Sequence, residues 1–142
     1  MAREALDAGH SALFVSLREL SQQLDAPAPR GGLAALRRYS QPTLLLIDEI
    51  GYTRLNPVQA QALFELVTAR YERRSTVLTS NLTFAEWGGL LGDEVLATAL
   101  LDRLLHHAEV IVTKTIHTLV HHRRSQKRSS SYFPSTRYMA AA

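Results

Sequence analysis

The chain has 142 residues, of which 46% are hydrophobic and 20% charged, with a formal net charge of +3 and no cysteine. This length and composition are typical of one globular domain with its own core, and the lack of cysteine excludes a disulfide framework and thiolate chemistry. No apolar run approaches the roughly 20 residues that span a bilayer, and Met1–Ala8 lacks the apolar stretch of a signal peptide, so we expect a cytoplasmic protein without membrane partners.

The amino-terminal part of the chain predicts a helix, a strand and a second helix. Ala2–Ala8 has a helical composition and is followed by Gly9, the residue type that most often ends a helix. His10–Val15 contains a short apolar run that is typical of a buried strand. Ser16, with Glu19 three residues later, has the pattern of a capping box, which predicts that the second helix begins there.

Two adjacent acids directly follow the most apolar run of the chain. Leu44–Ile47, which comes after a short predicted helix at Leu33–Tyr39, is expected to be a strand buried on both faces of a sheet. Asp48 and Glu49 then lie at the carboxyl end of that strand, where open α/β sheets bind ligands. Two like charges at the edge of a core are costly unless a cation offsets them. The pair is either a Walker B site, with Asp48 on Mg²⁺ and Glu49 on the attacking water, or a plain acidic turn.

A polar amide follows the next predicted strand. Asn56 and Pro57 predict the start of a long helix, and the strand after it covers Ser75–Thr79. Asn81 lies just past the end of this strand, so in a parallel sheet its amide would come close to Glu49 and could bind a water molecule or a phosphate oxygen. The alternative is a turn residue whose side chain bonds its own backbone.

The last predicted elements are a helix from Asp93 to about His106, a strand at Glu109–Thr113 and a short strand at Ile116–Val120. Strands that alternate with helices predict a parallel α/β sheet. Arg103 points outward from the leucine-rich face of the helix. It is either an exposed helix charge or an arginine finger for a neighbouring subunit's γ-phosphate site, a task that suits a planar and always charged guanidinium.

The six histidines do not predict a metal site. His106-His107 and His121-His122 are adjacent pairs, whose side chains do not face one another on a helix. No third ligand stands at a convincing spacing, and cysteine is missing. We therefore expect the histidines to extend the basic surface.

No acidic residue follows Glu109, and the final stretch of the chain is basic. Such a segment attracts polyanions, so it is either a nucleic-acid contact or a solvated, disordered tail. The residues expected to contact nucleic acid are Arg123, Arg124, Lys127 and Arg128.

The sequence contains no phosphate-binding loop of the G-x-x-x-x-G-K-[ST] type. The glycine pairs Gly31-Gly32 and Gly88-Gly89 are not followed by Lys-Ser or Lys-Thr. An amide cradle for phosphates is therefore not encoded in these 142 residues.

Several segments together have the pattern of a known family. They are Leu44–Tyr52, Phe64–Val67, Arg70–Thr76, Thr79–Leu82, Phe84–Trp87 and Ala99–Ala108. Over roughly residues 2–124 the chain resembles the IstB-type transposition helper ATPases, which are related to the DnaC-type helicase loaders. The resemblance is most specific between Tyr71 and Leu82.

The resemblance implies a three-layer α/β/α parallel sheet of the AAA+ or P-loop NTPase type. It also implies binding of ATP and Mg²⁺, oligomerisation on DNA, and delivery of a transposase to its target. Asp48 and Glu49 match the Walker B pair, with Mg²⁺ held by Asp48 through water. Asn81 matches the sensor I position, and Arg103 matches the arginine finger.

Two departures from the family modify these expectations. The family's phosphate loop lies upstream of the helix that corresponds to Ala2–Ala8, and the strand before that loop is central, between the Ser75–Thr79 and Glu109–Thr113 strands. We expect its loss to leave inner strand edges unpaired. In addition, Ile116–Leu119 lacks the sensor II arginine, and Ser125–Ala142 has no match in the family.

The sequence thus predicts a partial ATP-binding domain over residues 1–124 and a basic, Ser-rich, disordered tail over 125–142. The expected function is that of an amino-truncated transposition helper with impaired nucleotide binding. Its expected partners are DNA, the transposase of the same element and further copies of itself. Two alternatives stay open: a non-catalytic subunit that joins rings of an intact paralogue and supplies Arg103, and a helicase-loader-like DNA-binding protein.

Overall fold

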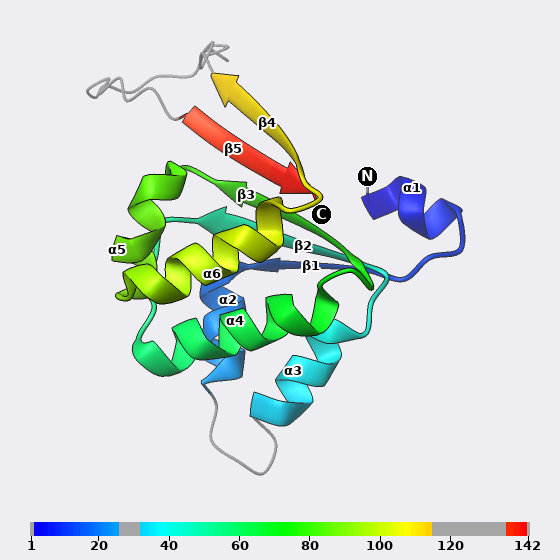
Figure 1. Cartoon of the computed structure of the whole chain (residues 1–142). Helices are drawn as coiled ribbons and strands as arrows, with labels where there is room; N and C mark the ends of the chain where they lie inside the picture. Colours follow the sequence, from blue (N-terminus) through cyan, green and yellow to red (C-terminus); the bar gives the residue numbers. More distant parts are fainter. Residues whose placement is uncertain (1, 26–31, 115–135, 142) are drawn as a thin grey trace, which may run out of the picture.

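The computed structural model describes residues 2–25, 32–114 and 136–141, and within them five strands form one sheet in the order β1-β2-β3-β5-β4 (Figure 1). The elements are α1 (Ala2–Asp7), β1 (Ala12–Ser16), α2 (Leu17–Leu24), α3 (Gly32–Ser40), β2 (Leu44–Ile50), α4 (Pro57–Arg70), β3 (Ser75–Ser80), η1 (Phe84–Glu86), α5 (Trp87–Leu91), α6 (Glu94–Leu105), β4 (Glu109–Lys114) and β5 (Thr136–Ala141). No helix in these ranges is both long enough and apolar enough to cross a membrane.

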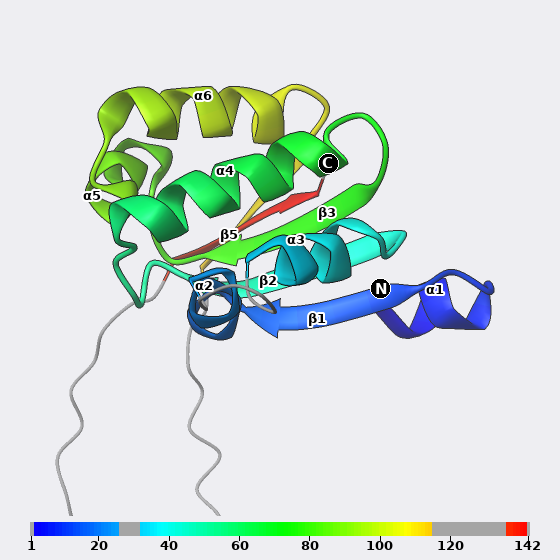
Figure 2. The same ribbon diagram turned by 90° about the horizontal axis from the view of Figure 1, so that it is seen from below.

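Three neighbouring strands of the sheet run parallel. β1 pairs with β2 and β2 with β3, so that Val15 stands opposite Ile47 and Ile47 opposite Leu78. Parallel neighbours need crossover connections, which α2 and α3 provide between β1 and β2, and α4 between β2 and β3. Helices α3, α4 and α6 lie along one face of the sheet (Figure 2). The predicted α/β class is confirmed, with three parallel strands and flanking helices.

The apolar run of β2 is buried on one face only. Leu45 and Ile47 expose at most 1% of their surface, whereas Leu44 and Leu46 on the opposite face are half-buried. Phe14, which pairs with Leu46 from β1, is 61% exposed. The expected burial on both faces is therefore wrong, because the core cluster that includes Leu45 and Ile47 lies on one side of these strands.

The helix starts that the sequence predicted are formed as expected. The Asn56 side chain accepts a hydrogen bond from Gln59 N at 2.8 Å, and the Gln59 side chain accepts one from Asn56 N at 3.0 Å, which completes a capping box before Pro57. Asp93 Oδ1 accepts from the first amides of α6, and Ser16 Oγ accepts from Glu19 N. These caps fix the residues at which α2, α4 and α6 begin.

A buried arginine ties together the ends of several elements. Arg70, the last residue of α4, exposes 1% of its surface. Its guanidinium donates hydrogen bonds at 2.9 Å to the carbonyls of Tyr39 and Pro42 and to Oγ1 of Thr76, and it also donates to Ser75 O. Burial, with a smaller contribution from Arg74, lowers the pKa of Arg70 to about 10, so this side chain stays charged at neutral pH.

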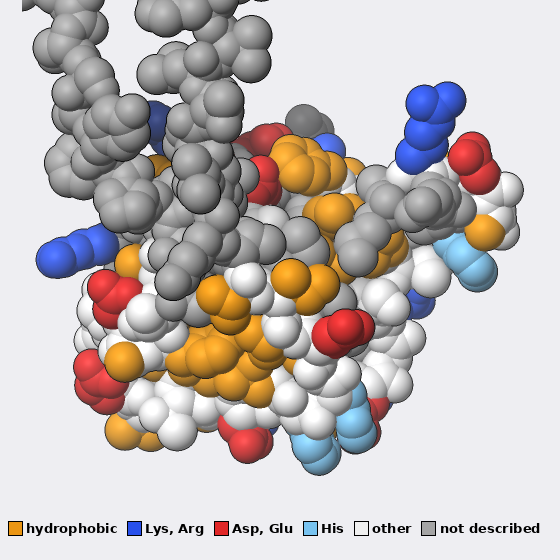
Figure 3. Space-filling model, turned by 90° about the horizontal axis from the view of Figure 1, so that it is seen from above, with side chains coloured by type: hydrophobic (Ala, Val, Ile, Leu, Met, Phe, Trp, Pro, Cys, Tyr) orange, Lys and Arg blue, Asp and Glu red, His pale blue; other side chains and the backbone are white. Residues whose placement is uncertain are grey.

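The carboxy-terminal strand occupies the interior of the sheet. β5 runs antiparallel to both neighbours, with Met139 opposite Thr79 on β3 and opposite Ile111 on β4. The expectation of unpaired inner edges is therefore wrong, because β5 fills the gap between β3 and β4. β4 becomes the outer strand, and Val110, Ile111 and Val112 are 39–56% exposed. Hydrophobic side chains gather on the surface seen from this edge (Figure 3).

The predicted division of the chain at residue 124 stays a prediction. Residues 125–135 lie outside the described residues, whereas Thr136–Ala141 form β5. The short strand expected at Ile116–Val120 also lies outside the described residues.

Candidate functional site

The acidic pair lies at the carboxyl end of β2, as predicted, and a threonine from β3 faces it. Asp48 is half-buried, and its Oδ1 accepts a hydrogen bond from Glu49 N at 2.9 Å and a second from the Thr79 hydroxyl. Its other oxygen, Oδ2, has no hydrogen-bond partner in the part of the chain that the structure describes. Asp48 is thus held in a fixed orientation with one carboxylate oxygen left for a ligand.

The backbone changes course between the two acids. The pairing of β2 with β3 shifts between Ile47 and Ile50, and Glu49 has φ +63 in the left-handed region. A residue with a side chain seldom adopts this conformation, and such strain is common at ligand sites. The irregularity turns Glu49 outward, so that its carboxylate is exposed while that of Asp48 stays at the sheet.

Asn81 lies beside this turn and contacts it closely. Its backbone N donates to Ile50 O at 3.2 Å, and its Oδ1 lies 2.0 Å from the position of a Cβ added at Gly51. Only a glycine leaves room for the amide at this distance. The side chain therefore lies against Gly51, while Thr79 Oγ1 accepts a hydrogen bond from Glu49 N at 3.3 Å.

The amide oxygen of Asn81 is buried and has no hydrogen-bond partner among the described residues. A buried acceptor without a donor costs about 1–3 kcal/mol, so this oxygen favours a water molecule or another donor at the turn. Together with the carboxylates of Asp48 and Glu49 it provides the oxygen ligands that Mg²⁺ and its bound water prefer. By donor type, these residues would fit a hydrated Mg²⁺ ion.

Arg103 lies away from the acidic pair. It lines a hollow of about 250 Å³ together with Ser75 and Thr76, at the start of β3, whereas Asp48 contacts Thr79 near the end of that strand. Its Nη1 donates to Ala99 O at 2.9 Å, and its guanidinium lies 4.6 Å from the centroid of the Phe64 ring. The structure therefore does not bring Arg103 together with Asp48 and Glu49 in one chain.

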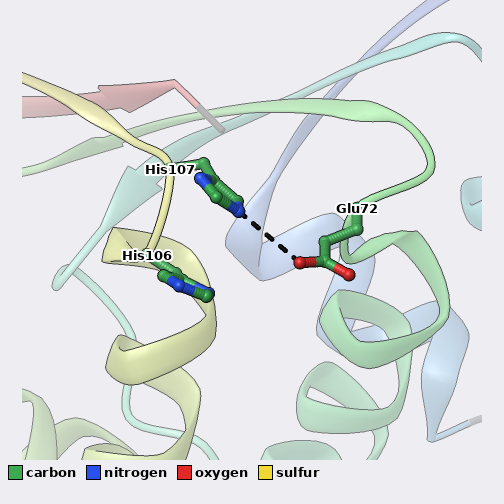
Figure 4. Close-up of side chains that lie close together, drawn as sticks. All are labelled: Glu72, His106 and His107. Carbon is green, nitrogen blue, oxygen red and sulfur yellow. Dashed lines mark ion pairs between the residues drawn. The ribbon is translucent and has the colours of Figure 1, made fainter.

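Sequence reasoning missed Thr79 and the surroundings of one histidine pair. The hydroxyl that directly follows the apolar pair Val77-Leu78 in β3 is the signal that could have identified Thr79. The expectation that His106 and His107 do not face one another is wrong: their rings stack with centroids 4.3 Å apart, because His107 lies beyond the end of α6. Glu72 joins them from the end of α4 (Figure 4).

The predicted DNA-contacting residues lie outside the described residues. These are Arg123, Arg124, Lys127 and Arg128.

Comparison with known proteins identifies close relatives over most of the chain. The family described as "IstB-like ATP binding protein" matches residues 1–129. The "Insertion sequence IS5376 putative ATP-binding protein" of Geobacillus stearothermophilus is 45% identical over 112 residues, which cover 78% of this chain and 45% of that protein. The "Insertion sequence IS21 putative ATP-binding protein" of Pseudomonas aeruginosa is also 45% identical over 112 residues, 78% of this chain and 42% of the relative. The chain thus spans less than half the length of these relatives.

Proposed function

Because this chain belongs to the IstB-like ATP-binding protein family, we propose that it serves an insertion sequence by assisting a transposase on DNA in the cytoplasm. Its part in this task is the metal and water side of an ATP site at the end of β2. The observation that carries the proposal is the buried, unpaired Oδ1 of Asn81 beside the acidic pair. This combination has no evident use in a plain acidic turn.

Each residue of the site has a distinct role in this proposal. Asp48 holds Mg²⁺ through a water molecule, and the ion, when bound, offsets the charge of the phosphates. Thr79 keeps the Asp48 carboxylate in place through its hydroxyl hydrogen bond. The exposed carboxylate of Glu49 orients the attacking water and accepts its proton. Asn81 accepts a hydrogen bond from water at its amide oxygen.

The phosphate side of the site is not encoded in these 142 residues. Without an amide cradle and its lysine, most ligands of a triphosphate are missing. We therefore propose that this chain alone binds ATP–Mg²⁺ weakly. Isothermal titration measures this directly, and a dissociation constant in the micromolar range would contradict weak binding.

A paramagnetic probe tests the site even when binding is weak. Mn²⁺–ATP is expected to broaden the NMR amide signals of residues 48–51 and 79–81, because a paramagnetic ion acts on nuclei close to it. Asp48→Asn keeps the shape of the side chain but removes its charge, and is expected to abolish the broadening. Arg54→Ala, an exposed change outside the site, is the control. Unbroadened signals around Asp48 in the natural chain would exclude the proposed site.

Arg103 supports a second candidate function, in which the chain completes another subunit's site. Its position toward the start of β3, away from its own acidic pair, suits a guanidinium that acts on a neighbouring copy. Titrating this chain into a full-length homologue should then change the ATPase rate, and Arg103→Ala should abolish that change while Arg54→Ala preserves it. An unaltered rate without co-elution would end this proposal.

DNA binding is proposed from the basic residues near the carboxyl terminus. Phosphate contacts make binding strongly salt-dependent and independent of sequence. Replacing the four residues together by glutamine is a better test than deletion, because deletion of the carboxy-terminal segment also removes β5. Gel shifts at low salt should weaken in this variant, and unchanged shifts would exclude these contacts. The residues are Arg123, Arg124, Lys127 and Arg128.

A further inference from the structure

The ends of two helices bring a carboxylate and two imidazoles together on the side of the sheet where Arg103 lies. Glu72 follows the end of α4, and His106 and His107 follow the end of α6. One ligand atom from each residue lies within 4.8 Å of the others (Figure 4). From this geometry we propose that the three side chains bind a divalent transition-metal ion of the Zn²⁺ class.

The distances suit a metal after small side-chain movements. Tetrahedral Zn²⁺ with bonds of about 2.0–2.1 Å places its ligand atoms about 3.3 Å apart. Nε2 of His107 and Oε1 of Glu72 are already 3.5 Å apart, and their side chains are 64% and 56% exposed. Both can therefore close around an ion without disturbing the core. Three protein ligands leave one coordination position for water or a ligand.

A tyrosine orients one of the two imidazoles. The hydroxyl of Tyr71 is hydrogen-bonded to Nδ1 of His106, and the two rings stack with centroids 6.0 Å apart. With Nδ1 engaged in this way, Nε2 is the nitrogen that coordinates. A hydrogen bond to the second nitrogen of a ligating imidazole is the usual support of a metal site, so Tyr71 acts as a positioning residue.

The local charges favour a transition metal over Mg²⁺ or Ca²⁺. The carboxyl ends of α4 and α6 carry partial negative charge, which attracts a cation. Arg73, Arg74 and Arg103 line the same hollow as Glu72 and His107 and oppose a cation held by charge alone. Imidazole nitrogen binds Zn²⁺, Cu²⁺ or Ni²⁺ far better than Mg²⁺. The donor set therefore selects a metal that forms bonds to nitrogen.

The competing explanation is a simple surface ion pair between His107 and Glu72, which needs neither His106 nor Tyr71. Zn²⁺ titration against a chromophoric chelator distinguishes the two. We expect one Zn²⁺ per chain to bind at this site, no competition by Mg²⁺, and an affinity that falls by at least about tenfold in His106→Ala, His107→Ala or Glu72→Gln. Tyr71→Phe should weaken binding by about tenfold, as expected for loss of a second-layer partner.

The chain offers a matched control in its second adjacent histidine pair. A His121→Ala/His122→Ala variant removes as many imidazoles as His106→Ala/His107→Ala but should keep the Zn²⁺ affinity. Co²⁺ provides a second readout, since its visible spectrum reports nitrogen ligation and should be lost only in the His106/His107 variant. The three ligands are exposed, so circular dichroism should show unchanged folding. Equal losses in both double variants, or full affinity in Glu72→Gln, would overturn the proposal.

Discussion

The side-chain oxygen of Asn81 occupies the space that a Cβ atom on Gly51 would need. The added atom would lie 2.0 Å from Asn81 Oδ1 and 2.6 Å from Leu82 Cγ, and Gly51 has φ +110. The turn after the acidic pair and the residue after β3 are therefore fitted to one another. A substitution at Gly51 disturbs the candidate site without removing any of its polar groups.

Gly51→Ala is expected to destabilise the protein by about 1–3 kcal/mol, because backbone strain and the clash with Asn81 act together. Urea unfolding followed by the fluorescence of Trp87, the chain's single tryptophan, measures the loss. Gly92→Ala separates the two causes, because Gly92 has φ +71 with nothing within 4 Å of its added Cβ. Equal losses of unfolding free energy in Gly51→Ala and Gly92→Ala would show that the clash with Asn81 does not destabilise the protein.

Local patterns predicted several parts of this structure well. The caps at Ser16, Asn56 and Asp93 depend on residues within three positions, so the sequence contains all the information they need. The acids at the end of an apolar run were also found, because Asp48 and Glu49 directly follow the run that forms β2.

Contacts between distant segments were not predictable in the same way. Thr79 meets Asp48 only because β3 pairs with β2 in one particular register. Glu72 meets His106 and His107 only because α4 and α6 end side by side. The position of β5 is a third case, since its sequence has few residues that favour strands and its partners are nonlocal.

Arg70→Met is expected to destabilise the protein by at least about 3 kcal/mol. The variant keeps an apolar chain of similar length but leaves the carbonyls of Tyr39, Pro42 and Ser75 without their donor, at roughly 1–3 kcal/mol for each group that water cannot reach. Urea unfolding provides the measurement. Arg73→Met changes an exposed neighbour, and its free energy of unfolding should stay within about 0.5 kcal/mol of that of the natural chain. Similar losses in both variants would contradict a specific role for Arg70.

Glu86 should contribute to stability in a pH-dependent way. Its Oε2 accepts hydrogen bonds from Thr83 N at 2.7 Å and Thr83 Oγ1 at 2.8 Å, and these bonds lower the pKa of Glu86 below its ordinary value of 4.5. A carboxyl group whose pKa is lower in the folded state stabilises that state at pH values above its unfolded-state pKa. This contribution disappears as the pH falls through the folded-state pKa.

The free energy of unfolding of the natural chain should therefore exceed that of Glu86→Gln by the largest amount above pH 4.5, and this difference should shrink in more acidic solution. Urea unfolding at a series of pH values tests this. Thr83→Ser keeps both donors and should follow the natural chain, whereas Thr83→Ala should lose part of the effect. A difference in unfolding free energy that is independent of pH would contradict the assigned hydrogen bonds.

The interior position of β5 makes the outer strand β4 depend on it. Met139 pairs with Thr79 on one side and Ile111 on the other, so Met139→Pro removes a donor from a strand that is bonded on both sides. Losing one ladder hydrogen bond of about 1 kcal/mol should speed amide hydrogen exchange in Glu109–Lys114 by at least about fivefold. Met139→Val favours a strand and should preserve the protection, and peptides from β1 serve as the internal reference. Exchange in β4 that is as slow in the proline variant as in the valine variant would show that β5 does not hold β4 to the sheet.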